Sequence, residues 1–134
     1  IIQTEASNFN FISLIGVIIA LLGVAIESIA DIQMSRFKLI PGNKGKLMDK
    51  GLWQFSRHPN YFGDSLFWWG VFIFSYGYTF NLLIIISPII MTYFLMRVSG
   101  VTLLERQLRH KKEGYEEYIN NTSSFILMPK KNKK

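Results

Sequence analysis

Residues 65–96 read SLFWWGVFIFSYGYTFNLLIIISPIIMTYFLM, a stretch without a single charged side chain. As one helix it would be about 48 Å long, well beyond the roughly 30 Å of hydrocarbon in a bilayer. The sequence Gly77-Tyr78-Thr79-Phe80-Asn81 offers a break near its middle. The stretch therefore predicts two membrane-spanning helices, roughly over residues 60–77 and 81–98, joined by a short uncharged turn.

An apolar segment earlier in the chain predicts one more crossing. Residues 6–26 carry no charge, so we place this span at about residues 9–30. After the last span, Leu103, Leu104 and Leu108 form an apolar stripe on a charged segment, which indicates an amphipathic helix at the membrane surface. The predicted fold is an all-α integral membrane protein. It is a single domain over residues 1–134, with about three transmembrane helices and a helical tail over residues 100–134.

The basic residues predict the orientation. The chain has 15 Lys and Arg residues and a net charge of +6, and all 15 lie within residues 36–57 or from residue 97 onward. Loops rich in basic residues face the cytoplasm. We therefore expect a multi-pass protein whose loop over residues 36–57 and tail over residues 100–134 are cytoplasmic. The confinement of the charge to these two segments favours the lipid bilayer over nucleic acid as the partner.

The composition and the N-terminal sequence exclude several kinds of site and a signal peptide. Cysteine is absent, which excludes disulfides and thiolate metal sites, and we expect no metal centre. The N-terminus lacks a basic region before its apolar stretch, so no signal peptide is expected.

A group of polar residues stands where the chain enters the second span. Ionisable groups are costly at this place and usually mark a functional site. Arg57 can bind a phosphate or carboxylate through its planar fork, and His58 can donate to a phosphate or titrate near neutrality. Asn60 and Asp64 are four residues apart, on one helix face, and suit recognition of an amide, a ribose or an adenine. In the alternative interpretation the basic pair anchors lipid headgroups, and Asp64 complements a helix N-terminus.

Two acidic residues occupy the cytoplasmic end of the first span. Glu27 and Asp31 are four residues apart, and we expect the helix to end beside them. An unpaired carboxylate at this depth is expensive. Each is therefore expected to pair with a basic residue, such as Arg36 or Arg57, or with a ligand.

Several motifs in a fixed order resemble the steroid 5-alpha-reductase-like membrane family, and more closely its branch with the steroid-reductase C-terminal domain. They are Glu27-Ser28-Ile29-Ala30-Asp31-Ile32-Gln33, Arg36-Phe37-Lys38, Asn43-Lys44-Gly45, Gly51-Leu52-Trp53-Gln54-Phe55-Ser56-Arg57-His58-Pro59-Asn60-Tyr61-Phe62-Gly63-Asp64, Leu103-Leu104-Glu105, Gly114-Tyr115, Tyr118 and Thr122-Ser123-Ser124-Phe125-Ile126. The resemblance extends over about residues 16–129. It implies that the chain is the C-terminal part of a larger family fold.

The resemblance also implies a cofactor and a reaction. Reductases of that family hold NADPH in a cytoplasm-facing cavity and reduce a carbon–carbon double bond conjugated to a carbonyl in a lipid. Carried over by position, the implied contacts to the nicotinamide cofactor include Asp31, Asn60, Asp64 and Tyr118. Arg57 and Arg109 are the implied candidates for contact with its phosphates. The full set of candidate cofactor-binding residues is Asp31, Arg57, His58, Asn60, Tyr61, Asp64, Arg109 and Tyr118. Tyr118 is also the candidate catalytic proton donor.

Two departures from the family pattern leave an alternative open. The carboxylate at Asp64 is commonly a glutamate in relatives, so its reach is shorter here. The family's reductases also use residues from earlier spans near the substrate carbonyl, and this chain does not contain those spans. A truncated membrane module without catalytic activity is therefore an alternative prediction.

A second family shares part of the signature. The run Arg57-His58-Pro59-x-Tyr61 followed by a distal glutamate resembles the isoprenylcysteine carboxyl methyltransferases, which bind S-adenosylmethionine. In that family a second acid adjoins the distal glutamate, whereas here Arg106 follows Glu105. The favoured hypothesis is a membrane-bound, NADPH-dependent reductase acting on a lipid-like or steroid-like substrate. The alternative is a methyltransferase that uses S-adenosylmethionine.

Overall fold

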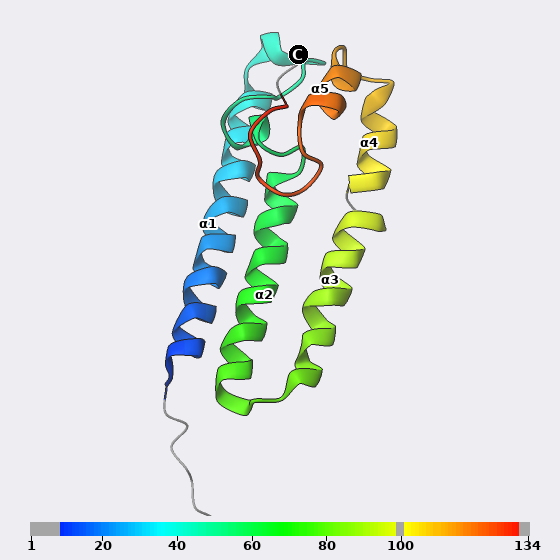
Figure 1. The fold of residues 1–134 in the computed structure, drawn as a ribbon. Coiled ribbons are helices and arrows are strands. Elements are labelled where there is room, and N and C mark those ends of the chain that lie inside the picture. Colours follow the sequence, from blue (N-terminus) through cyan, green and yellow to red (C-terminus); the bar gives the residue numbers. More distant parts are fainter. Residues whose placement is uncertain (1–8, 99–100, 132–134) are drawn as a thin grey trace, which may run out of the picture.

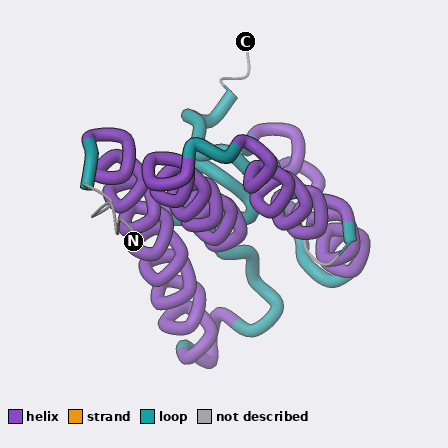
Figure 2. Tube along the Cα trace, turned by 90° about the horizontal axis from the view of Figure 1, so that it is seen from below, coloured by secondary structure: helices purple, strands orange, loops and turns teal. Residues whose placement is uncertain are grey.

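The computed structural model describes residues 9–98 and 101–131, and in these ranges it consists of helices and loops without a strand (Figure 2). The helices α1 (Phe11–Leu39), α2 (Pro59–Thr79) and α3 (Ile86–Arg97) lie side by side, with α2 in the middle. Two shorter helices, α4 (Val101–Arg109) and α5 (Tyr115–Asn121), stand at the end of the bundle where α2 begins (Figure 1). The described part of the chain therefore confirms an all-helical fold.

The first helix is longer than the sequence suggested. Asn10 caps α1 by accepting a hydrogen bond from the backbone N–H of Ser13, and the helix then runs for 29 residues to Leu39. The prediction that it ends near residue 30 was wrong, and the connection begins only at Ile40. No proline or glycine interrupts residues 31–39, and the helix stops just before the 3₁₀ turn Pro41–Asn43.

Glycines allow α1 and α2 to touch along their backbones. A Cβ atom on Gly70 would lie 2.3 Å from the backbone nitrogen of Ala20 and 2.7 Å from the carbonyl oxygen of Gly16. A Cβ on Gly63 would lie 2.5 Å from the backbone nitrogen of Glu27. Both distances are far below van der Waals contact. Small residues in contact positions are the usual way in which helices pack closely in membranes.

A short turn joins α2 to α3. α2 ends at Thr79, and Phe80 takes the left-handed conformation with φ 51° that ends the helix. A 3₁₀ segment, Leu82–Ile85, leads into α3, so Pro88 lies in the first turn of α3. Proline costs no hydrogen bond in that position. The predicted turn between the two helices is thus confirmed.

Two helical stretches are long and apolar enough to cross a membrane. They are Phe11–Leu39 and Leu82–Arg109, the second of which includes residues 99–100, outside the described part of the chain. α2 is 21 residues long but carries Asp64 and many tyrosines and tryptophans, which lower its apolar character. As the middle helix it is flanked by α1 and α3. The expected third crossing, over residues 60–77, stays a prediction.

The tail forms the expected helices. α4 covers most of the predicted amphipathic segment, with Leu103 and Leu104 exposed. Gly114, at φ 78°, separates it from α5, because this left-handed conformation suits glycine. After α5 the chain turns back toward the start of α2 (Figure 1). Residues 132–134 of the predicted tail lie outside the described residues.

Candidate functional site

The Ser56–His58 segment is held rigidly at the entrance to α2. The Ser56 hydroxyl donates to the carbonyl oxygen of Phe125 at 2.7 Å and accepts from the backbone N–H of His58 at 3.1 Å. The backbone N–H of Arg57 donates to the carbonyl oxygen of Ser123 at 2.8 Å. Ser56 and His58 are almost completely buried. The C-terminal segment after α5 therefore fixes the position of the basic pair.

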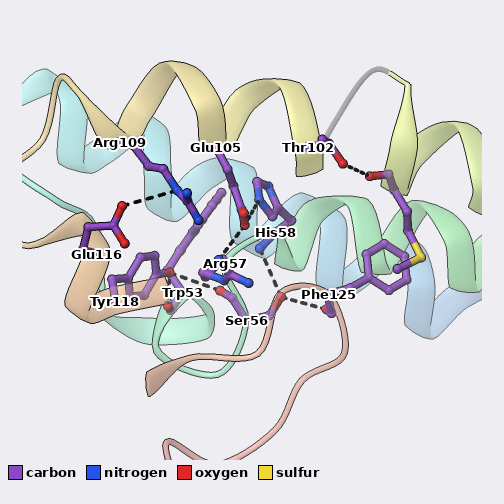
Figure 3. A network of polar contacts seen from close by, with 11 residues as sticks. Trp53, Ser56, Arg57, His58, Thr102, Glu105, Arg109, Glu116, Tyr118 and Phe125 are labelled. Atoms are coloured by element: carbon purple, nitrogen blue, oxygen red, sulfur yellow. Dashed lines mark hydrogen bonds and ion pairs between the residues drawn. The ribbon is translucent and has the colours of Figure 1, made fainter. Parts of the chain in front are cut away.

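Glu105 is the acidic partner of both basic residues. Its Oε1 lies 2.8 Å from Arg57 Nη1 and 3.2 Å from His58 Nε2, and all three side chains point toward one another (Figure 3). The alternative in which Arg57 pairs with Glu27 or Asp31 is not found among the described residues. Glu105 lies on α4, and it contacts His58 although the two residues are 47 positions apart in the chain.

Asn60 and Asp31 form a second polar pair. The Asn60 side-chain amide donates from Nδ2 to Asp31 Oδ1 at 3.1 Å. A carboxylate only accepts hydrogen bonds when ionised, so this contact determines which way the amide faces. Asn60 Oδ1 is buried and has no hydrogen-bond partner among the described residues, and the same holds for Arg57 Nε. Buried polar atoms without partners are uncommon, and each asks for an explanation such as a bound ligand or water.

A cavity of about 460 Å³ brings these pairs together. Its size falls in the range of small-molecule sites. Residues from α1, the connection, α2, α4 and α5 line it: Asp31, Met34, Ser35, Lys38, Leu47, Met48, Trp53, Arg57, His58, Asn60, Leu104, Leu108, Lys112, Tyr115 and Tyr118. Five of the predicted site residues are thus in one cavity, namely Asp31, Arg57, His58, Asn60 and Tyr118.

Three predicted residues do not line this cavity. Tyr61 stacks on the His58 ring, with ring centroids 5.6 Å apart and planes 8° from parallel, so it supports a lining residue from behind. Asp64 lies one turn further along α2, beside Gly63, where the helix packs against α1. Arg109 pairs with Glu116 at 3.4 Å, and both of these side chains are largely exposed.

Two tyrosines of α5 close the cavity. The Tyr118 hydroxyl donates to the backbone carbonyl oxygen of Trp53 and also lies 3.3 Å from the backbone carbonyl oxygen of Ser56. Burial raises the pKa of this phenol well above its usual value. Burial also raises the pKa of Tyr115 to about 12, with nearby Glu105 adding to the effect. Both phenols therefore stay protonated at neutral pH.

Lys38 and Lys112 were missed at the sequence level. Lys38 lies seven residues after Asp31, with Met34 and Ser35 between them, and this spacing places all four on one helical face. This spacing could have indicated Lys38 from the sequence, but only if α1 was expected to continue beyond residue 30. Lys112 donates from Nζ to the carbonyl oxygen of Lys46 at 2.9 Å. Burial and the charge of Lys38 lower the pKa of Lys112.

Comparison with known proteins assigns the chain to a family. The model of the family described as "Protein of unknown function (DUF1295)" matches residues 1–122. The chain belongs to the DUF1295 family. This DUF1295 protein is also 33% identical over 104 residues to a Delta(14)-sterol reductase of Ascobolus immersus, an alignment that covers 75% of the chain and 21% of the reductase. No solved structure matches the chain.

These findings support a sterol-reductase-like membrane family. The DUF1295 chain corresponds to about a fifth of the length of that reductase, so the whole reductase contains much that this alignment does not cover. Together with the two apolar helices, the similarity indicates an integral membrane protein.

Proposed function

We propose that this protein is a membrane-bound reductase that binds NADPH in the cavity between α1, α2, α4 and α5. The observation that carries the proposal is the unpartnered Asn60 Oδ1 in a cavity that also contains Asp31, Arg57 and two lysines. The relation to a sterol reductase supports the same assignment.

The polar groups of the cavity fit a nicotinamide dinucleotide. Asn60 Oδ1 is an acceptor for an amide N–H or a ribose hydroxyl, and Asp31 is an acceptor at the rim beside it. Lys38 and Lys112 are the candidate phosphate contacts, because both line the cavity, where burial and then the charge of Lys38 lower the pKa of Lys112. A bound phosphate would relieve this repulsion. Arg57 Nε is a further donor that has no acceptor among the described residues.

The proposed reaction is the reduction of a carbon–carbon double bond in a sterol-like lipid. NADPH held by Asn60, Asp31 and the two lysines would supply the hydride for one carbon of the bond, and in the substrate class expected from the family the bond is conjugated to a carbonyl. The second carbon then takes a proton. The protein's part is to position the cofactor, exclude water and deliver that proton.

The two tyrosines differ as proton donors. Tyr118 was the candidate from the sequence, but its hydroxyl already donates to the backbone carbonyl of Trp53. The Tyr115 side chain lines the same cavity, and its hydroxyl makes no hydrogen bond to a described residue. We therefore favour Tyr115 as the donor and assign Tyr118 to holding α5 against the connection.

Label transfer tests the reaction. The full-length protein in nanodiscs is incubated with NADPH deuterated at the transferable position and with a Δ14-sterol or an enone steroid. Mass spectrometry should find a product that has gained one deuterium and one proton. Methyl transfer from labelled S-adenosylmethionine to lipid, with no deuterium incorporation from NADPH, would replace this proposal with the methyltransferase. Absence of both reactions would favour the non-catalytic module.

A further inference from the structure

A second cavity shares no lining residue with the first. It has a volume of about 380 Å³ and is formed by α2, α3 and residues 123–126 of the C-terminal segment. Most of its lining is apolar, including Phe62 on α2, Met96 on α3 and Phe125. We call it the Ser65 slot, after the almost completely buried serine in its wall.

Three polar groups in the Ser65 slot are bonded to one another. The Ser65 and Thr92 hydroxyl oxygens are 2.8 Å apart, and either can donate to the other. The indole N–H of Trp69 donates to Thr92 Oγ1 at 3.1 Å. These contacts join α2 to α3 inside a wall that is apolar apart from Ser123 and Ser124 of the C-terminal segment.

A count of protons shows that this cluster is incomplete. The two hydroxyls carry two protons, and their mutual hydrogen bond uses one of them. In residues 9–98 and 101–131 the two hydroxyls bond only to each other and to the Trp69 indole, so the second proton has no acceptor there. Ser65 lies six residues beyond the start of α2, about 9 Å along the helix. A hydroxyl proton without an acceptor is costly where water is scarce.

We propose that the Ser65 slot binds a membrane lipid whose apolar body carries one hydroxyl or carbonyl oxygen. That oxygen accepts the spare proton of the Ser65–Thr92 pair, while the apolar body lies against Phe62 and Phe125, which already pack edge to face at 5.7 Å between ring centroids. Sterols and fatty acids both have this chemistry. The proposal stands apart from the reductase activity, since none of these residues lines the cofactor cavity.

The C-terminal segment links the two cavities. Phe125 covers the Ser65 slot, and its carbonyl oxygen accepts the Ser56 hydroxyl bond that also positions His58. The backbone N–H of Met128 donates to the carbonyl oxygen of Phe55 at 3.0 Å, which ties down the end of the same segment. A lipid in the slot thus packs against the segment that holds the basic pair.

Photo-crosslinking with two probes tests the proposal. The full-length protein is labelled with a photoreactive cholesterol analogue or a photoreactive fatty acid, and the labelled peptides are mapped. We expect labelling of α2, α3 or residues 122–128. Ser65→Ala combined with Thr92→Val should reduce that labelling roughly two- to tenfold, the effect of one lost hydrogen bond. Ser75→Ala, on α2 outside the slot, is the matched control and should leave it unchanged.

A competition experiment needs no variant. Unlabelled cholesterol should displace the sterol probe at least threefold better than cholestane, which has the same rings without the oxygen. Labelling in the slot by one probe alone supports the proposal and identifies the lipid class. Labelling confined to other segments, or equal competition by cholestane, would overturn it.

Discussion

Replacing Glu105 with glutamine should destabilise the protein far more than the same change at Glu116. The Glu105 side chain is only 14% exposed and faces Arg57, which is 9% exposed, whereas Arg109 and Glu116 are 47% and 66% exposed. Removing one partner of a buried ion pair costs about 3–5 kcal/mol. Glutamine keeps an acceptor for His58, so we expect the lower end, about 3 kcal/mol. An exposed pair contributes less than about 1 kcal/mol.

Thermal unfolding in one detergent measures the difference. A loss of about 3 kcal/mol should lower the apparent melting temperature of Glu105→Gln by roughly 10 °C. Glu116→Gln should shift it by no more than about 3 °C. Adding Arg57→Met to Glu105→Gln should restore part of the loss, because no buried charge is then left unpaired. Equal shifts for Glu105→Gln and Glu116→Gln would refute the assignment of Glu105 as the buried counter-charge.

Four further results follow from packing, titration and hydrogen bonding. Gly70→Ala should abolish the folded protein or lower its melting temperature sharply, because the new Cβ would meet the backbone of α1, whereas Gly42→Ala, with no atom within 4 Å, should be neutral. A circular-dichroism melt of both variants checks this. Tyr115 should ionise at about pH 12 in an ultraviolet titration, and Tyr115→Phe should remove that transition. The pKa of Tyr118 is raised as well. Both phenols therefore contribute stability that is complete below pH 10, the ordinary pKa of a tyrosine, and that is lost as the pH rises above it. A rise in stability from pH 9 to 11 would contradict this. Tyr118→Phe should cost about 1–2 kcal/mol in urea unfolding, because a buried carbonyl loses its donor, and no loss would contradict the role assigned to this hydroxyl.

The local features of the fold could be read from the chain itself. The two helices expected at about residues 60–77 and 81–98 depend on neighbouring residues only, and the structure has α2 at Pro59–Thr79 and α3 at Ile86–Arg97 with a turn between them. The end of α1 does not follow from the chain in the same way, because Glu27 and Asp31 predict a helix end near residue 30 and the helix continues to Leu39. That error also hid Lys38, which shares the face of Asp31 only if the helix continues.

The partners within the site depend on contacts between distant segments. Asn60 and Asp31 are 29 positions apart, and His58 and Glu105 are 47 apart. Neither pairing follows from helical periodicity. The motif residues could be named from their order in the chain, but the pairing of Arg57 with Glu105 required the position of α4. Tyr118 lines the cavity together with four other candidate residues, and its role there stays a prediction, whereas its bond to the connection was not foreseeable.

Nucleotide binding at the Asn60 amide is the most direct test of the proposed cofactor site. The full-length protein, Asn60→Ala and the exposed control Asn120→Ala are purified in the same detergent and titrated with NADPH and with S-adenosylmethionine. We predict that the unaltered protein and Asn120→Ala bind NADPH equally well. Asn60→Ala should bind it at least tenfold more weakly, a loss of about 1.4 kcal/mol. Equal NADPH affinity in Asn60→Ala, or binding of S-adenosylmethionine alone by the unaltered protein, would contradict the account.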